Sequence, residues 1–594
     1  ELDREMKIEK PTATLIAFAK TGLLKPGEST QLVLRFGRDE MASYCYTRDN
    51  GDGTTGCYML EEGQYVLSLR RNSHEVIETT NWHNSQTIWY DQSNPRPSEI
   101  KMQAAMDDDG TLLDVPERAE ADNEAGFIAA TNLFPYMNEY MNDEVVMLTR
   151  ANWEATLPFG EKISGKQINQ KYIDMFGQEN AFNAASDPRL GNVQGSDVYA
   201  ADPVQEKQKN DLTLISLRGK DFYDEAWDLL LDQLDYTADH DDIRQILTGT
   251  SYSTNAIASI GLPQSLHCEG ANGVRLDNGD GIGSDHSRDT SSWCMAPEMA
   301  ATWNTELMRE MGEAMGQECL KEKVSTILGP GTNIKRAPVC GRNFEYFSED
   351  PYLAGKCSAS VINGVQSKGV GTSLKHFACN SQEAFRMVLN EVIDERTMRE
   401  IYLPAFEIAV KESQPWTVMN SYNRINGIYA SQNKHLQQDI LRDEWGFEGL
   451  IVTDWGASVD RIPGLENGTD LEMPSSGTLN QNRIVAAVKN GELDEAVLDE
   501  RVDNVVNLIM KSKPALENEH TFDPKAHHAI AQKVAEGSMV LLKNDDKILP
   551  LKKGQKVAVI GEMAKAPRFQ GAGSSVINPT MLSNAYDELE KLGV

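Results

Sequence analysis

The stretch GLIVTDWGA, residues 449–457, joins a short apolar run directly to a carboxylate and an indole. The apolar residues 450–452 predict a buried strand, and Thr453, Asp454 and Trp455 follow it without an intervening turn. An aspartate at this place is either the N-cap of a helix or a catalytic carboxylate at the carboxyl end of a barrel strand. Neighbouring segments of the chain favour the second interpretation.

Several segments between about 206 and 515 share this pattern. VSTILGPG, GTSLKHF, WTVMNSYN and GTDLEMP each run from apolar to polar residues, and amphipathic helical stretches lie between them. Repeated strand–helix units predict a parallel sheet or barrel with its active site at the carboxyl ends of the strands. The side chains at places equivalent to Asp454 are Lys375, His376, Met419, Tyr422 and Glu472. Because the strands end alike, the pattern indicates a site rather than one capping residue.

The bulk properties of the chain restrict its class. Its 594 residues are too many for one core and predict three or four domains. The net charge of −33 disfavours binding to nucleic acid or to an anionic membrane, whereas an uncharged sugar is a compatible substrate. No apolar run approaches the ~20 residues of a membrane span. The N-terminal ELDREMKIEK lacks the apolar core of a signal peptide.

The 8 cysteines are scattered and form no CxxC pair. Reduced thiols and a cytoplasmic location are therefore expected, with secretion as the alternative. A disulfide between Cys45 and Cys57 in a hairpin is an option that the sequence leaves open.

Four regions differ in their patterns. Residues 1–83 predict β structure, with a KPGE turn between strand-like runs. Residues 84–205 are polar and predict a long connection, and residues 206–515 hold the strand–helix units. Residues 520–594 predict the start of an open α/β domain: a helix over AIAQKVAEGSMVLLKN, a strand over KVAVIGE and the loop RFQGAGSSVINP. This last domain is predicted to be incomplete, because one such unit cannot cover both faces of a parallel strand.

Four motifs resemble those of glycoside hydrolase family 3, in the family's order and at its spacing. They are GPGTNIKRAPVCGRNFEYFSEDPYLAG (residues 329–355), KHFACNSQEAFR, VMNSYNRINGIYAS and VTDWGA. The resemblance runs from about Leu212 to Pro579, and the N-terminal β region fits too. It implies an α/β protein with a (β/α)8-type barrel over 206–515, a partial α/β sandwich domain over 520–594 and a partial fibronectin type III-like β domain over 1–83.

The resemblance also implies a retaining β-glycosidase that removes terminal β-D-glucose from β-linked oligosaccharides. In such enzymes one carboxylate attacks the anomeric carbon, and a second carboxyl protonates the departing oxygen and then activates water. Asp454 matches the attacking carboxylate, and Lys375 and Arg342 are the cations expected to keep it ionised. Neither a cofactor nor a metal is expected, since two carboxyl groups suffice and the histidines lack zinc-ligand spacing.

Further positions match sugar-binding residues of the family. Carried over one at a time, they are Glu269, Arg342, Lys375, His376, Arg386, Met419, Tyr422 and Trp455. Some of them have structural alternatives. The two arginines could be ion-pair partners of Glu345 or Glu383, Met419 could belong to the core, and His376 could be a buried histidine with satisfied hydrogen bonds.

Glu269, in LPQSLHCEGANGVR (residues 262–275), departs from the family pattern. Family β-glucosidases usually have an aspartate here, which holds the hydroxyls at C4 and C6. The extra methylene of glutamate would crowd the C6 group, and family β-xylosidases often have glutamate, whereas DWGA is the β-glucosidase form. Glucose is the favoured substrate, with β-xylosidase or dual activity as the alternative.

The order of the regions also departs from the family. There the barrel comes first, then the sandwich, then the fibronectin-like domain, so this chain is circularly shifted. The acid/base glutamate of multidomain relatives lies on the sandwich, downstream of GAGSS, and no residue here matches it. We therefore expect a companion polypeptide or fragment that completes both partial domains and supplies this glutamate, since open sheet edges and apolar faces would otherwise remain. A homo-oligomer is also compatible with the sequence.

Two rival functions differ in kind. A carbohydrate-binding protein that has lost catalysis fits the missing acid/base but not the intact segment around Asp454. A β-N-acetylglucosaminidase of the same family would carry its acid/base histidine in a short Asp-His motif. DHDD at residues 239–242 contains both residue types, but it precedes the first barrel motifs, which disfavours this alternative.

Overall fold

The computed structural model describes most of the chain outside the predicted connection 84–205. The described residues are 8, 10–51, 55–91, 93–96, 209–217, 220, 224–234, 242–276, 289–476, 479–570 and 573–593. Most of that connection and the first three residues of DHDD therefore lie outside them. Within the described residues, none of the helices combines the length and the apolar character needed to cross a bilayer.

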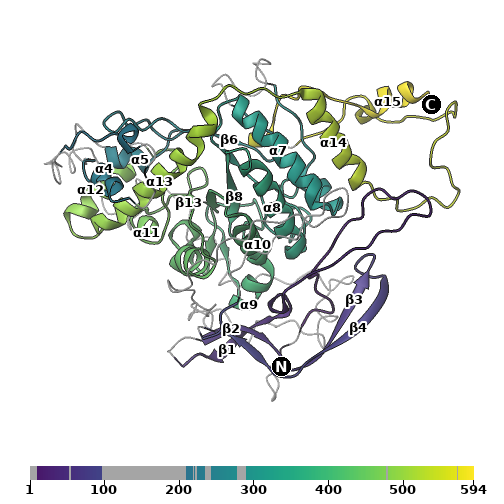
Figure 1. Ribbon diagram of the computed structural model, residues 1–594, viewed down its shortest axis with the longest axis horizontal. Coiled ribbons are helices and arrows are strands. Elements are labelled where there is room, and N and C mark those ends of the chain that lie inside the picture. Colours follow the sequence, from purple (N-terminus) through teal and green to yellow (C-terminus); the bar gives the residue numbers. More distant parts are fainter. Residues whose placement is uncertain are drawn as a thin grey trace.

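A five-stranded parallel sheet forms the centre of the protein (Figure 1). In spatial order its strands are β13 (Leu450–Val452), β10 (Thr417–Asn420), β8 (Gly371–Phe377), β7 (Thr326–Leu328) and β6 (His267–Glu269). Each neighbouring pair is parallel. Every residue of β7, β8, β10 and β13 is buried, which is typical of parallel strands covered on both faces. The predicted α/β class is confirmed.

Further pairings extend this sheet into a circuit. Val452 pairs with Leu471, and Thr248 pairs with Glu472, both in parallel orientation. At the opposite edge, the backbone N of His267 in β6 donates to the carbonyl of Tyr252 (2.7 Å), shortly after Thr248. The series of hydrogen-bonded neighbours therefore runs from Thr248 through the five strands to Tyr252, close to its starting point, and so forms a circuit.

Helices surround this circuit in Figure 1. They are α4 (Ala226–Leu231), α5 (Asp242–Ile246), α6 (Ala296–Ala301), α7 (Thr305–Lys321), α8 (Pro351–Gln366), α9 (Glu395–Thr397), the π-helix η7 (Met398–Tyr402), α10 (Pro404–Ser413), the π-helix η9 (His435–Glu444), α11 (Arg461–Glu466), α12 (Leu479–Lys489) and α13 (Glu495–Leu516). Helix α8 begins where it does because Asp350 accepts from Leu353 N (2.9 Å) and Pro351 presets the first turn. Its apolar face packs with α7 and β7 in one core cluster.

Shorter elements fill the connections. They are the 3-10 helices η1 (Arg38–Met41), η5 (Leu214–Leu217), η8 (Ala430–Gln432), η10 (Glu562–Ala564) and η11 (Gly573–Ser575), and the strands β9 (Asn390–Glu391), β11 (Arg424–Ile425) and β12 (Ile428–Tyr429). The three strands form a small sheet in the order β12-β11-β9.

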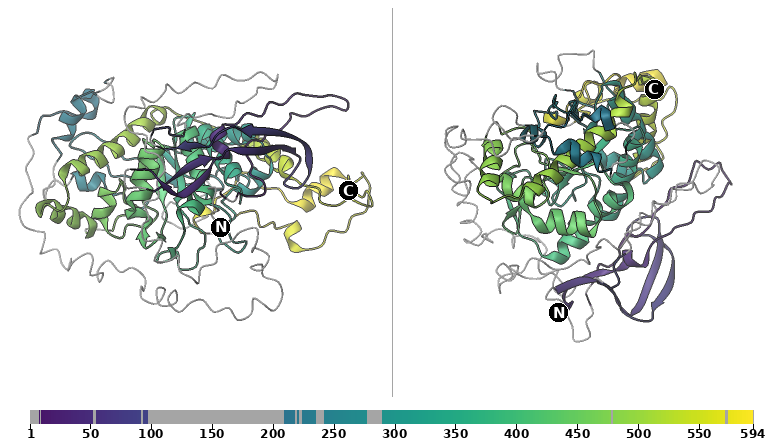
Figure 2. Two further views of the ribbon diagram at one scale, coloured as in Figure 1. Left: turned by 90° about the horizontal axis from the view of Figure 1, so that it is seen from below. Right: turned by 60° about the vertical axis from the view of Figure 1, so that its left-hand side comes forward.

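The N-terminal β region consists of two small antiparallel sheets, drawn in purple at one edge of the molecule (Figures 1 and 2). One contains β1 (Ser43–Asp49), β2 (Thr55–Leu60) and β5 (Ile88–Tyr90), and the other contains β3 (Gly63–Arg70) and β4 (Val76–Asn84). The β structure therefore continues to Tyr90, past the predicted boundary at residue 83. Cys45 and Cys57 are opposite one another across β1 and β2, and both are free thiols.

This region is joined to the helices that follow β8. The backbone N of Tyr44 donates to Glu400 Oε1 (2.7 Å), and the Tyr58 hydroxyl donates to the carbonyl of Arg399 (3.0 Å). Glu400 and Arg399 lie in η7. The guanidinium of Arg399 also lies over the Tyr44 ring, 5.2 Å from its centroid. A buried polar contact therefore links the two regions.

Two apolar segments that the sequence predicts as strands form none. On either side of the KPGE turn, which Glu28 N closes by donating to Lys25 O (2.9 Å), residues 14–36 are extended without strand pairing. The segment KVAVIGE, residues 556–562, also lacks a partner strand in the described chain, and Ile560 is 91% exposed. The strand predictions are wrong here because a strand needs a neighbour to take its backbone hydrogen bonds.

The C-terminal region is attached through α14 (Pro524–Ser538), which Asp523 caps and which ends before the predicted MVLLKN. His527 Nδ1 lies 2.7 Å from Glu318 Oε1 of α7. Beyond α14 the chain, drawn in yellow, extends past the other helices to α15 (Ala585–Leu592) in Figure 1 and in the left view of Figure 2. Thr290 N donates to Asn578 O (3.0 Å), which joins the C-terminal region to the segment before α6.

Candidate active site

The carboxyl ends of four strands carry the predicted site residues. Glu269 ends β6, Lys375 and His376 lie near the end of β8, Met419 lies in β10, and Asp454 follows β13 closely. Parallel strands present their carboxyl ends at one edge of a sheet, so the fold brings together residues from separate motifs. Arg342 reaches the same place from the loop after β7, because its Nη2 lies 2.7 Å from His376 Nε2.

Asp454 is buried at the centre of this group. Its Oδ1 accepts from Trp455 N (2.7 Å), and its Oδ2 lies 3.6 Å from His376 Nε2. Burial raises the pKa of Asp454 above its ordinary value, and Arg342 and Lys375 oppose this shift without cancelling it. The two cations therefore act in the expected direction but do not lower the pKa below that of a free aspartate.

Asp454 is not a helix cap. The next helix, α11, begins at Arg461, and its cap is Asp460, which accepts from Ile462 N (3.2 Å). The first of the two interpretations of GLIVTDWGA is therefore wrong. The carboxylate of Asp454 is held at the end of a strand.

Lys375 lies between two carboxylates. Its Nζ donates to Glu269 Oε2 (3.0 Å) and lies 3.9 Å from Glu345 Oε2. Burial alone would lower the pKa of Lys375, but Glu269 and Glu345 outweigh it, and the pKa is raised. Lys375 is therefore a cation near Asp454, and its charge tethers Glu269 of β6 to β8.

Both predicted arginines, Arg342 and Arg386, form ion pairs with glutamates, as their alternative structural roles predicted. Arg342 is paired with Glu345 and lies 3.9 Å from Glu383, and Arg386 Nη1 donates to Glu383 Oε2 (2.6 Å). Burial opposes the charge on Arg342, but Glu345 and Asp454 are among the groups that raise its pKa. The ion pairs hold the guanidinium of Arg342 beside the nucleophile candidate, so the structural role and a binding role are compatible.

His376 is buried, and both of its ring nitrogens lie within hydrogen-bond distance of polar partners. This agrees with the alternative that it is a buried histidine with satisfied hydrogen bonds. Nε2 faces Arg342, and Nδ1 lies 3.0 Å from the Tyr346 hydroxyl. The His376 backbone N donates to Asn333 Oδ1 (2.7 Å). Burial, and then the charges of Arg342 and Lys375, hold the pKa of His376 well below its usual range, so the ring is neutral.

Aromatic rings line one side of Asp454. The Tyr422 hydroxyl donates to the carbonyl of Trp455 (3.0 Å), and Arg386 lies 4.6 Å from the centroid of the Tyr422 ring. The Trp455 ring is tilted by 39° against Tyr252, with centroids 5.1 Å apart. An indole face beside the carboxylate is a suitable surface for a sugar ring. Met419 is only 1% exposed and packs in the hydrophobic core, which agrees with its alternative role.

Tyr346 and Tyr252 were missed from the sequence, and Glu345 and Glu383 were considered only as ion-pair partners of the two arginines. Glu345 and Tyr346 stand three and four places after Arg342 in GRNFEYF, so a carboxylate and a hydroxyl close to a predicted arginine were a usable signal. Glu383 lies in the KHFACNSQEAFR motif, between two predicted positions. Tyr252 gave no signal, because it precedes all four motifs.

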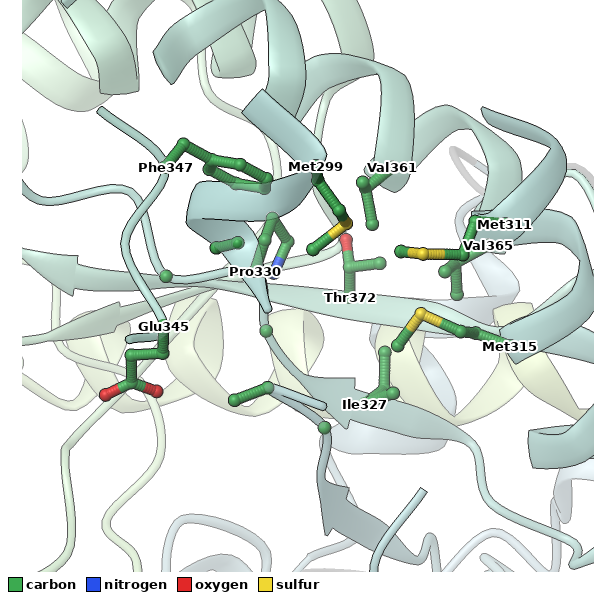
Figure 3. Close-up of a pocket in the computed structure, with 15 residues that line it drawn as sticks. Met299, Met311, Met315, Ile327, Pro330, Glu345, Phe347, Val361, Val365 and Thr372 are labelled. Atoms are coloured by element: carbon green, nitrogen blue, oxygen red, sulfur yellow. The ribbon is translucent and has the colours of Figure 1, made fainter. Parts of the chain in front are cut away.

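A narrow apolar cavity lies behind this site, between the sheet and helices α6, α7 and α8 (Figure 3). Three methionines line it: Met299, Met311 and Met315. Glu345 borders its other end in Figure 3. Because its lining is apolar apart from Glu345 and Thr372, the cavity suits core packing rather than a sugar. The described residues also contain no cluster of three or more His, Cys, Asp or Glu side chains arranged to hold a metal ion.

Comparison with known proteins gives consistent matches. Residues 274–508 match the glycosyl hydrolase family 3 N terminal domain, and residues 539–593 match the glycosyl hydrolase family 3 C-terminal domain. The chain is 46% identical over 344 residues to thermostable beta-glucosidase B of Acetivibrio thermocellus, covering 58% of this chain and 46% of that protein. It is 47% identical over 359 residues to an exo-alpha-(1->6)-L-arabinopyranosidase of Bifidobacterium breve, covering 58% and 47%.

A solved structure agrees with these matches. The GH3 beta-glucosidase of Bifidobacterium adolescentis superposes with a TM-score of 0.56 at 45% identity, covering 59% of this chain and 51% of that one. The chain spans about half the length of the curated relatives it matches.

Proposed function

Because the chain belongs to glycosyl hydrolase family 3, we propose that it is a retaining β-glycosidase that releases terminal β-D-glucose from oligosaccharides. The observation that carries the proposal is the buried carboxylate of Asp454, set among Arg342, Lys375 and His376. Similarity to beta-glucosidases supports the substrate class. The circuit of strand pairings supports the barrel architecture that the family resemblance implies.

In the proposed reaction, an oxygen of ionised Asp454 forms a bond to the anomeric carbon while the bond to the leaving oxygen breaks. A second carboxyl donates a proton to that oxygen. The same group then takes a proton from water as the water oxygen bonds to the anomeric carbon and the bond to Asp454 breaks, which releases glucose and frees Asp454. Arg342 and Lys375 favour the ionised form of Asp454, as required for attack. Trp455 offers its indole face to the sugar.

A mechanism-based inhibitor tests the role of Asp454. A 2-deoxy-2-fluoro β-glucoside with a good leaving group should inactivate the enzyme, and peptide mass spectrometry should find the fluoroglucosyl adduct on Asp454. A carbohydrate-binding protein without catalysis would form no adduct. Binding of glucose without labelling would therefore reject the glycosidase and favour that alternative.

Pentopyranosides are the second candidate substrates. Glu269 reaches across the site to Lys375, and a relative of 47% identity is named an arabinopyranosidase. A pentopyranose lacks the C6 hydroxymethyl group that the longer glutamate would crowd. Comparing kcat/KM for aryl β-glucoside, β-xyloside and α-L-arabinopyranoside decides the preference. A Glu269→Asp variant should shift the ratio towards glucoside if the extra methylene excludes C6.

A companion polypeptide or fragment is proposed as the source of the second carboxyl. The exposed apolar segment 556–562 supports this, since a partner strand beside it would cover Val557, Val559 and Ile560. Denatured intact-mass measurement of an active preparation tests the idea. A second species should accompany the chain, whereas full turnover from the 66.0 kDa species alone would reject the companion.

A further inference from the structure

The two ring nitrogens of His376 have partners of different kinds. Arg342 Nη2 lies 2.7 Å from Nε2, and the Tyr346 hydroxyl lies 3.0 Å from Nδ1. A guanidinium only donates hydrogen bonds, whereas a hydroxyl can donate or accept. Nε2 must therefore accept, because a proton on it would point at another donor.

The position of the imidazole proton follows from this constraint. His376 is neutral, since a charged ring would place two donors against each other at Arg342. One nitrogen of a neutral imidazole carries a proton, and with Nε2 accepting it is Nδ1. The Tyr346 hydroxyl oxygen then accepts from Nδ1–H, as it also accepts from Asn380 Nδ2 (2.9 Å). A hydroxyl has two lone pairs, so it can take both donors.

We propose that Tyr346 is a positioning residue that holds His376 in its Nδ1–H form, so that Nε2 accepts from Arg342 and directs no proton towards Asp454. Asp454 Oδ2 lies 3.6 Å from His376 Nε2. In the other tautomer Nε2–H would donate towards Asp454, stabilise its charge and make it a weaker nucleophile, while opposing Arg342. The proposal rests on the proposed role of Asp454 in glycoside cleavage.

Tyr346→Phe tests the proposal, because it keeps the buried ring and removes only the hydroxyl. We expect kcat/KM to fall about tenfold, in line with the loss of one hydrogen bond. The acid limb of the kcat/KM profile, which reports Asp454 in the free enzyme, should move to lower pH as Nε2–H begins to donate to Asp454. Simple misplacement of the ring would lower the rate without that shift.

The matched control is Tyr58→Phe, which removes another buried tyrosine hydroxyl, in β2 of the N-terminal β region, at the contact with Arg399. It should leave the acid limb in place. An equal shift in both variants, or none in Tyr346→Phe, would overturn the proposal.

Nitrogen NMR measures the tautomer without reference to activity. With 15N-labelled histidines, of which the chain has 10, the His376 signals are assigned by their loss in His376→Gln. The wild type should show a protonated Nδ1, and Tyr346→Phe should show an increased share of protonated Nε2. A protonated Nε2 in the wild type rejects the proposal even if Tyr346→Phe fails to fold. Absence of a covalent adduct on Asp454 would instead reject the proposed function.

Discussion

The segments 450–452 and 556–562 are both apolar, yet they have opposite environments. LIV of β13 lies between β10 and residue 471, and all three residues are buried. KVAVIGE has no partner strand in the described chain, and its apolar side chains are exposed. Burial of a Val or Ile side chain contributes about 1.5–3 kcal/mol. The comparison teaches that an apolar pattern gives a segment the capacity to be a strand, but neighbouring strands decide the outcome.

The largest effect on activity is expected at Asp454, which directly follows the paired strand β13. Asp454→Asn should lower kcat/KM for an aryl β-glucoside about 10⁴-fold, because an amide cannot attack the anomeric carbon. Initial rates measure this, and circular dichroism should show an unchanged fold. Asp460→Asn is the matched control, since asparagine caps α11 as well as aspartate does. Equal losses in the two variants would remove the distinction between catalytic and capping aspartates.

Lys375→Met should have the next largest effect, since it leaves Glu269 and Glu345 near one another without their shared cation. We expect a loss of about 3–5 kcal/mol in the free energy of unfolding. Urea titration monitored by tryptophan fluorescence measures this loss. Lys375 lowers the pKa of Asp454, so its removal raises that pKa. The acid limb of kcat/KM should therefore move to higher pH. A shift to lower pH would contradict the proposed electrostatics.

Ile451→Ala measures what pairing adds to an apolar side chain. Ile451 is fully buried in β13, and truncation should cost about 2–5 kcal/mol through lost burial and a cavity. Urea unfolding of the variant and the wild-type protein gives the difference in the free energy of unfolding. A cost below about 1 kcal/mol would mean that the site collapses around the smaller residue.

Ile560→Ala should have the smallest effect on the free energy of unfolding. The side chain is 91% exposed, so the same truncation should alter the free energy of unfolding by less than about 0.5 kcal/mol. If a companion strand covers this segment, the variant should instead weaken association with the companion. A large loss of stability in the isolated chain would show that the segment is already buried there.

Sequence reasoning located β7, β8, β10 and β13 because these strands carry local signals, whereas the short strand β6 was not predicted. GTSLKHF and GLIVTDWGA contain both the buried run and the functional residue that follows it, so each could be placed without knowledge of its neighbours. The end of the N-terminal β region at Tyr90 was missed because IWY is short and lies in polar surroundings. The exposed strands were predicted wrongly because pairing is not a local property.

The site was predicted in part for a related reason. Motifs identified the residues at the strand ends, but not the contacts among them. Lys375 of β8 joins Glu269 of β6 rather than Asp454, and Tyr346 contacts His376 from the loop after β7. Such contacts require the fold, because the partners are far apart in the sequence or hidden inside a motif.

The pairing of Thr248 with Glu472 sets a condition on biosynthesis. These residues are separated by more than two hundred positions, so the pairing forms only after Glu472 has been synthesised. At about 5–20 residues per second, a ribosome needs roughly 10–45 seconds to pass from one to the other. During that time the segment at Thr248 lacks its later neighbour, and the edge of the partly formed sheet stays unpaired. The chain is therefore expected to depend most on chaperones while it is still being translated.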